Sequence, residues 1–178
     1  LLLPLGLFTL GNASDVFLLL KASASNAPTA TLPLLWVALH VVKSVASVPA
    51  GKLADRIGRR RIIAAGWMFY AFIYVCFAFA ETQATIWGLF IAYGLYHALT
   101  EGAEKALVVE LVERSNVGTG FGFYHLTLGI MSMLASVIFG LLWDTLGSQT
   151  AFLSSASLAV AATAALGMTY STRLASPR

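Results

Sequence analysis

Charged residues are scarce in this sequence: Asp, Glu, Lys and Arg together make up 11% of its 178 residues. A soluble domain usually carries about 25% charged residues, so the composition excludes an ordinary globular domain. The chain is instead 58% hydrophobic, in long apolar runs separated by short polar stretches, which is typical of membrane proteins. The net charge of +3 is concentrated in a few places, which argues against a nucleic-acid-binding protein with its broad basic face.

Residues that form metal and catalytic sites are equally sparse. The single cysteine, Cys76, lies inside an apolar run and can form no intrachain disulfide, so we expect it to serve packing. The sequence contains no HExxH, no clustered Cys/His set and no GxSxG elbow. We therefore predict no metal site, no cofactor and no enzymatic activity, and an intramembrane enzyme would need a catalytic pair that the sequence does not show.

Long apolar runs dominate what is present. A helix that crosses about 30 Å of hydrocarbon needs roughly 20 apolar residues, and six runs approach that length without the alternation of a barrel strand. These runs predict an all-α membrane protein. It would form a single six-helix transmembrane domain over residues 1–178, with spans at about 1–20, 32–48, 62–80, 85–109, 119–143 and 151–170.

Lys and Arg lie mostly on one side of this predicted topology. The opposite side holds only Lys21, while Lys43 and Lys105 lie near span ends on the basic side. Because cytoplasmic loops carry the excess of positive charge, both termini and the 49–61 loop are predicted to be cytoplasmic. Eight basic residues carry the prediction: Lys52, Arg56, Arg59, Arg60, Arg61, Arg114, Arg173 and Arg178.

Polar residues also occur at membrane depth, where a charged group costs about 2.5–3.5 kcal/mol at a helix centre. Asn12 and Asp15, three residues apart in the first span, would share one helix face. Four in the fourth span, at spacings of four, four and three, would form one stripe that must face a watery cavity or another polar surface. The six residues predicted to form a substrate or proton cavity are Asn12, Asp15, Tyr93, His97, Glu101 and Glu104.

Simpler roles remain open for some of these residues. Glu101 and Lys105, at positions i and i+4, could form an ion pair that only holds the helix. His97 could be a packing or hydrogen-bonding residue rather than part of a proton path. In the fifth span, glycines and small polar residues at spacings of three and four predict close helix packing, and its GTGFG stretch lacks the GK[ST] ending of a phosphate loop.

The stretch GKLADRIGRRR, residues 51–61, holds six of the nineteen charged residues. Five positive charges resist translocation across the membrane. The stretch also resembles the G-x-L-a-D-R-x-G-R-R loop of the major facilitator superfamily, which joins the second and third helices of each six-helix half. It lies between the second and third predicted spans, on the basic side, and its matching residues are Gly51, Asp55, Arg56, Gly58, Arg59 and Arg60.

Three further segments, FTLGNASDVFLLLKA, TEGAEKALVVELV and GTGFGFYHLTLG, resemble a bacterial branch of that family at helices seven, ten and eleven. One departure is Arg114-Ser115-Asn116, where an arginine-glycine pair is more usual. The resemblance implies that residues 1–178 are the carboxyl-terminal half of a twelve-helix transporter, built from two inverted three-helix repeats. The first residue is not Met and already lies in an apolar run, which also leads us to expect a piece of a longer protein.

The resemblance further implies secondary active transport of a small solute by alternating access, coupled to an ion or a proton. Asp55 would cap or pair at the end of a neighbouring helix, and the arginines would pair with acidic groups and lipid phosphates, forming a cytoplasmic gating loop. The implied partners are the bilayer of the bacterial inner membrane, the absent amino-terminal half and an unidentified solute, in a monomeric protein. A self-contained six-helix scaffold or assembly factor without transport activity is the alternative.

Overall fold

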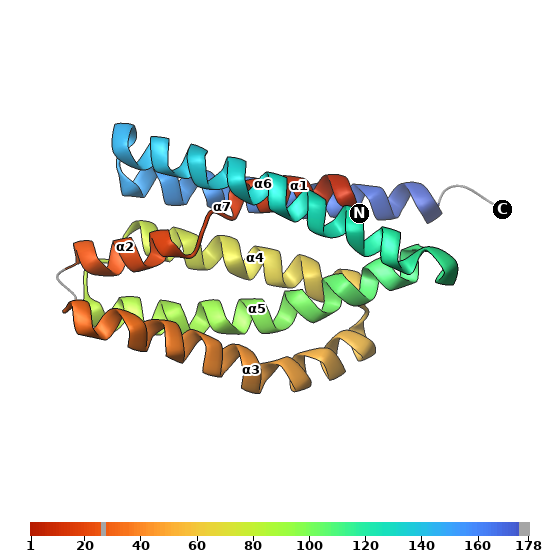
Figure 1. The fold of residues 1–178 in the computed structure, drawn as a ribbon, viewed down its shortest axis with the longest axis horizontal. Helices are drawn as coiled ribbons and strands as arrows, with labels where there is room; N and C mark the ends of the chain where they lie inside the picture. The colour runs from red at the N-terminus through yellow and green to blue at the C-terminus, as the bar shows by residue number, and fades with distance from the viewer. Residues whose placement is uncertain (26–27, 175–178) are drawn as a thin grey trace.

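The computed structural model describes residues 1–25 and 28–174, and within them every regular element is helical. The long helices lie side by side along one axis (Figure 1). Arg178, which contributed to the predicted topology, lies outside the described residues. The elements are α1 (Leu2–Gly11), α2 (Val16–Ala24), η1 (Thr29–Thr31), α3 (Leu32–Ile57), α4 (Arg59–Ala78), α5 (Gln83–Leu111), η2 (Arg114–Asn116), α6 (Val117–Leu146) and α7 (Ser148–Leu174).

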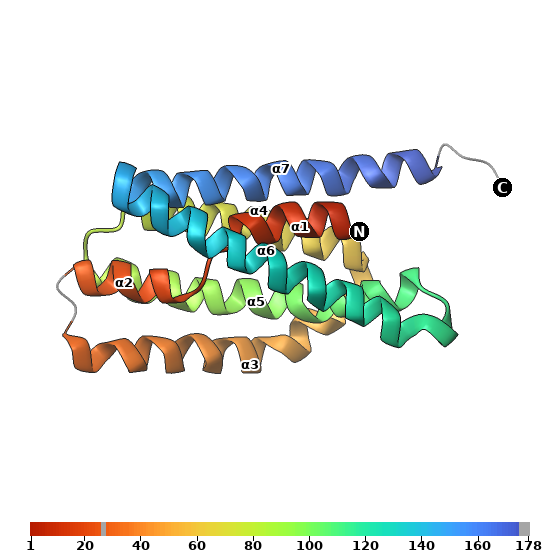
Figure 2. The same ribbon diagram turned by 45° about the horizontal axis from the view of Figure 1, so that its top comes forward.

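Five segments are long and apolar enough to cross a membrane. They are Leu2–Ala24, Leu32–Ile57, Arg59–Ala78, Arg114–Leu146 and Ser148–Thr169. The fourth predicted span, which corresponds to α5, is not among them, because the polar stripe that it carries lowers its hydropathy. It nevertheless lies within the bundle, packed along α3 and α4 (Figures 1 and 2). The described residues thus form an all-helical bundle with five segments that could cross a membrane, and α5 is its polar inner helix.

The connections alternate between the two ends of the bundle. The α3–α4 turn, the α5–α6 connection and the end of α7 lie at one end, and the α4–α5 and α6–α7 turns lie at the other (Figures 1 and 2). The basic α3–α4 turn thus shares an end with the start of α6. This is the arrangement that the predicted topology requires, while the side that faces the cytoplasm stays a prediction.

Packing between the helices is reciprocal. The first span contacts α6 and α7, α5 contacts α3 and α4, and α4 packs along α7. If the first span, α3 and α4 are taken as one three-span unit and α5, α6 and α7 as the other, the first helix of each unit packs against the second and third helices of the other unit. Two interlocked three-helix repeats of opposite orientation would give this pattern.

The prediction that residues 49–61 form a loop is wrong, because almost all of this stretch is helical. The α3 helix continues to Ile57 and α4 begins at Arg59, so that Gly58 alone joins them. Ala, Leu, Lys and Arg are good helix formers, and they extend the helix beyond the apolar run. Gly58 has φ +96°, a conformation that favours glycine because it has no Cβ.

The α6–α7 turn repeats this arrangement. Gly147, with φ +86°, alone separates α6 from α7. Each glycine follows an aspartate by three residues, in Asp55-Arg-Ile-Gly58 and Asp144-Thr-Leu-Gly147. The equivalent turns of the two three-span units thus carry the same short signal, which sequence reasoning missed.

The first span is broken, so the prediction of one helix over residues 1–20 is wrong. The α1 helix ends at Gly11 and α2 begins at Val16, which leaves residues 12–15 outside any helix. Asn, Ser and Asp in this stretch compete with the helical backbone for hydrogen bonds. The backbone groups freed at the break find partners on other helices: Tyr70 donates its hydroxyl to the Gly11 carbonyl at 2.9 Å, and the Ser14 N–H donates to Ser136 Oγ at 3.2 Å. Such partners make a broken helix tolerable inside a membrane.

Burial is uneven among the helices. In the most apolar stretch of α4, 56% of the residues are buried, against 11% in α3 and 11% in the segment that contains α6. The buried face of α4 holds a row of large aromatic side chains, Trp67, Tyr70, Tyr74 and Phe77. The core is therefore centred on α4 and on the faces of α1, α5 and α7 that meet it, while α3 and α6 present most of their surface outward.

Candidate functional site

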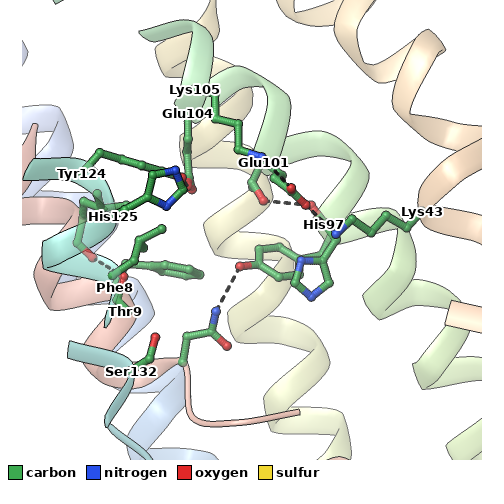
Figure 3. Close-up of a pocket in the computed structure, with 15 residues that line it drawn as sticks. Phe8, Thr9, Lys43, His97, Glu101, Glu104, Lys105, Tyr124, His125 and Ser132 are labelled. Atoms are coloured by element: carbon green, nitrogen blue, oxygen red, sulfur yellow. Dashed lines mark hydrogen bonds and ion pairs between the residues drawn. The ribbon is translucent and has the colours of Figure 1, made fainter. Parts of the chain in front are cut away.

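A cavity of about 270 Å³ lies between α1, α3, α5 and α6. It reaches the break in the first span through Asn12, and Tyr96 of α5 lies beside that residue. Figure 3 shows the polar and aromatic side chains that converge on this space. Those labelled there are Phe8, Thr9, Lys43, His97, Glu101, Glu104, Lys105, Tyr124, His125 and Ser132.

Glu101 lies between two ammonium groups. Its Oε2 is 2.5 Å from Nζ of Lys43 on α3, and its Oε1 is 2.8 Å from Nζ of Lys105 on its own helix. The i,i+4 ion pair left open by the sequence is therefore formed. Lys43 is a second partner that sequence reasoning missed, and it links α3 to α5. All three side chains are partly exposed to the cavity, so water weakens the two ion pairs.

Glu104, three residues further along α5, has quite different surroundings. It is buried, with 7% of its surface exposed. Its Oε1 accepts a hydrogen bond from Nε1 of Trp67 at 3.0 Å, and its Oε2 accepts one from the Tyr124 hydroxyl at 3.0 Å. Both donors are uncharged, and they come from α4 and α6. This carboxylate therefore joins three helices, and among the described residues no basic side chain lies within hydrogen-bond distance of it.

Asp15 lies at the end of the break in the first span. The Tyr93 hydroxyl donates to its Oδ1 at 2.7 Å, and Nε2 of His97 is 3.9 Å from its Oδ2. Asn12, at the start of the break, accepts from Tyr93 at 3.4 Å and donates to Tyr96 at 3.5 Å. The break is thus held against the polar stripe of α5 by side-chain hydrogen bonds.

The structure brings the six predicted cavity residues into one connected region. Asn12, His97, Glu101 and Glu104 line the cavity. Tyr93 and Asp15 do not line it, but they are joined to it through the hydrogen bonds of Asn12 and through His97. The predicted face shared by Asn12 and Asp15 does not exist, because no helix connects them. They meet the same stripe from a non-helical segment.

Sequence reasoning missed the contribution of α4. Its Trp67, Tyr70 and Tyr74 lie beneath the site, with the Tyr70 and Tyr74 rings 4.0 Å apart and Tyr70 5.1 Å from Tyr96 between ring centres. Their spacing of three and four residues resembles that of the stripe on α5, so a search for polar aromatic residues at helical spacing could have found them. Tyr124 of α6 carried no comparable signal, and His125 lies on the small and polar face of the fifth span that the sequence assigns to helix packing.

The matched residues of the 51–61 segment form a tight corner at one end of the bundle. Arg59 forms an ion pair with Glu110 near the end of α5, donates to the Ala106 carbonyl at 3.4 Å, and lies 3.8 Å from Asp55. Asp55 therefore pairs across the turn, but its side chain is 71% exposed and no side chain caps the start of α4. Arg59 thus connects this corner to α5.

Together these groups offer charged and neutral hydrogen-bond donors and acceptors around a space large enough for a small solute. In the part of the chain that the structure describes, no three His, Cys, Asp or Glu side chains gather as metal ligands would. The carboxylates, ammonium groups, imidazoles and phenols around the cavity can bind a solute through hydrogen bonds and can exchange protons.

Residues 5–177 match the family model of the Major Facilitator Superfamily. The chain belongs to this superfamily. It is 30% identical over 160 residues to an uncharacterized MFS-type transporter, MJ1317, of Methanocaldococcus jannaschii, covering 86% of the chain and 40% of the relative. It is also 29% identical over 159 residues to the MFS-type transporter ppzB of Metarhizium rileyi, covering 89% of the chain and 31% of the relative.

The family match confirms the resemblance first found in the 51–61 segment, and with the apolar helices it makes the chain an integral, multi-pass membrane protein of a transporter family. The chain spans well under half the length of the curated relatives that it matches. Those relatives come from an archaeon and a fungus, so a bacterial source stays a prediction. Membrane transport is the general function that the family supports.

Proposed function

We propose that residues 1–178 are the carboxyl-terminal half of a secondary transporter that moves a small solute by alternating access, coupled to a proton or another ion. The observation that carries the proposal is the broken first span, whose polar residues 12–15 are hydrogen-bonded to the stripe of α5 beside a polar cavity. Discontinuous helices of this kind often form substrate and ion sites in transporters.

The exposed faces support the idea of a missing half. Helices α3 and α6 contribute Lys43, Tyr124 and His125 to the cavity, yet most of their own surface is not covered by the rest of the chain. A second six-helix half packed on α3 and α6 would place the cavity at the centre of the assembly. Rocking of the two halves would then open the cavity to one side of the membrane at a time.

The surroundings of the carboxylates suggest separate roles. Glu101 has two ammonium partners, one on α3 and one on α5, which suit it to holding these helices together. Asp15 and Glu104 accept hydrogen bonds from uncharged donors, so a proton can be added without breaking an ion pair with Lys or Arg. We assign the coupling proton to Asp15 and Glu104, with His97 as the group that links Asp15 to the cavity.

The corner at Gly58 supplies a candidate gate. The ion pair between Arg59 and Glu110 ties the start of α4 to the end of α5, at the end of the bundle that we assign to the cytoplasm on the basis of its basic residues. Breaking and re-forming this pair would allow the α3–α4 corner to move relative to α5. Gly51, Asp55, Arg56, Gly58 and Arg60 complete the proposed gating segment.

The experiment is transport by the full-length protein in proteoliposomes, with a pH gradient and a panel of solutes. Once a transported solute is found, Asp15→Asn should reduce proton-driven transport by about tenfold, within the range typical of coupling between two sites. The matched control is Asp144→Asn, which changes an exposed aspartate at the α6–α7 turn and should leave transport unchanged. Transport by Asp15→Asn with the rate and pH dependence of the wild type would contradict the role of Asp15.

A further inference from the structure

A second cavity, of about 610 Å³, lies at the end of the bundle that carries the α3–α4 turn, away from the proposed transport cavity and sharing no residue with it. Its charged lining consists of three arginines and one glutamate, so it carries two formal positive charges in excess. The rest of the lining is apolar or small and includes residues of α4 and α7. The charged residues are Arg59, Arg60, Arg61 and Glu110.

An apolar groove of about 400 Å³ continues along the same two helices. The cavity ends on α4 at Ala64 and the groove begins at Met68, one turn further along. On α7 the groove ends at Val160 and the cavity begins at Thr163. Because α4 and α7 pack side by side, cavity and groove form one continuous seam. The groove is lined by Met68, Ala71, Phe72, Val75, Leu153, Ala156, Ser157 and Val160.

The seam is long enough to hold a lipid acyl chain from the headgroup level to beyond the middle of the membrane. The 20 residues of α4 span about 30 Å, the thickness of the hydrocarbon core, so its first residues, Arg59 to Arg61, lie at the level of the lipid headgroups. From Arg61 to Val75 the helix rises about 21 Å, somewhat more than half of that core. A lipid whose headgroup met the arginines would therefore lay its acyl chain along the groove.

The residues that line the seam indicate which class of lipid would bind there. Guanidinium groups bind phosphate oxygens through paired N–H donors and are more weakly hydrated than ammonium groups. Large apolar side chains such as Phe72 (62% exposed) and Val160 (46% exposed) line the groove below them. One end of the seam thus attracts an anion and the other end attracts hydrocarbon, which are the two ends of an anionic phospholipid.

We propose that the α4–α7 seam binds one anionic phospholipid, with its phosphate held by Arg60 and Arg61 and one acyl chain in the apolar groove. Arg59 contacts Glu110 and Asp55 and adds its charge to the same end of the seam. Bound in this way, the lipid joins the α3–α4 corner to α7. The site is independent of the transported solute and does not require that the chain transport anything.

The test is native mass spectrometry of the full-length protein in detergent, titrated with phosphatidylglycerol or with phosphatidylcholine. We expect tighter binding of one phosphatidylglycerol molecule than of phosphatidylcholine. Each basic residue near a membrane surface contributes about fivefold to the binding of anionic lipid, so the double variant Arg60→Gln and Arg61→Gln should weaken that binding about thirtyfold. The control removes two exposed charges from α3 outside the seam, by Lys52→Gln and Arg56→Gln, and should weaken binding clearly less than the seam variant does. An equal loss would mean that only the general charge of this end attracts the lipid, and it would overturn the proposal.

The acyl-chain groove is tested without changing any charge. Ser157→Trp fills the groove and should weaken binding of phosphatidylglycerol, whereas Ala161→Trp places the same side chain at an exposed position of α7 outside it and should not. Equal binding of the two lipids, or equal weakening by both tryptophan variants, would overturn the proposal. Displacement of the lipid by millimolar inorganic phosphate would show a free-phosphate site and would overturn it as well.

Discussion

Two glutamates three residues apart on α5 show how strongly the surroundings decide the role of a residue. Glu101 is partly exposed and has two ammonium partners, whereas Glu104 is buried with two uncharged donors. The sequence places both on one stripe, but their partners come from α3, α4 and α6. Losing Glu101 would leave two lysines facing each other. Losing Glu104 would instead leave buried donors without an acceptor.

This difference predicts a large loss of stability for Glu104→Leu. The substitution leaves the Trp67 N–H and the Tyr124 O–H without their acceptor, and each buried unsatisfied group costs about 1–3 kcal/mol. The thermal unfolding midpoint of the full-length protein in detergent should therefore fall clearly. The control is Glu113→Leu, at an exposed glutamate between α5 and α6. If the two variants unfold at the same temperature, the hydrogen bonds of Glu104 do not stabilise the bundle.

Individual site residues could be predicted where a polar side chain lies at membrane depth, because its free-energy cost there requires an explanation. A polar or charged residue within an apolar run is easily recognised, and the sequence therefore predicts the residues on α5 and at the break. Tyr70, Tyr74 and Trp67 are ordinary members of an aromatic-rich span, and their hydroxyl and indole groups matter only because α1 and α5 pack against them. Lys43 was noted only for its place near a span end, since its partner Glu101 lies on another helix.

Among the helices, the apolar runs predicted their order along the chain but not their ends. Hydropathy marks the part of a helix inside hydrocarbon, whereas the backbone stays helical into the headgroup region, and α3 therefore extends nine residues beyond the predicted end at Val48. The break after Gly11 was missed for another reason. Its backbone groups are satisfied by Tyr70 and Ser136, which lie far away in the sequence.

The contact between α3 and α5 depends on a glycine. A Cβ atom at Gly94 would lie 2.6 Å from the Leu39 carbonyl oxygen and 3.1 Å from the Val42 Cβ, so even alanine requires a shift of the helix backbone. Gly94→Ala should therefore destabilise the protein by about 1–3 kcal/mol, as overpacking usually does, and this should lower its unfolding midpoint.

The matched control lies on the same helix. A Cβ atom at Gly88 meets nothing within 4 Å, so Gly88→Ala should leave the unfolding midpoint unchanged or raise it, because alanine favours a helix over glycine by about 1 kcal/mol. Equal effects of the two alanines would mean that α3 and α5 do not approach each other as closely as the structure shows.

For the molecule as a whole, the distribution of exposed apolar surface separates two kinds of outer face. The seam between α4 and α7 is grooved and ends at arginines, which suits lipid. The outward faces of α3 and α6 flank the polar cavity and carry large exposed side chains such as Val45 (73% exposed) and Met133 (63% exposed). If the chain is half of a transporter, the second half covers these two faces and leaves α4 and α7 to the bilayer.

Spin labels can distinguish these faces in the full-length protein. After Cys76→Ala, cysteine is introduced singly at Val45, Met133 or Phe72, labelled, and reconstituted into lipid vesicles. Molecular oxygen concentrates in the hydrocarbon core, so a label that faces lipid relaxes fast and a label covered by protein does not. We expect strong oxygen relaxation at position 72 on α4 and weak relaxation at positions 45 and 133. Equally strong oxygen relaxation at all three positions would place α3 and α6 against lipid. That result would contradict the half-transporter and would favour a self-contained six-helix bundle.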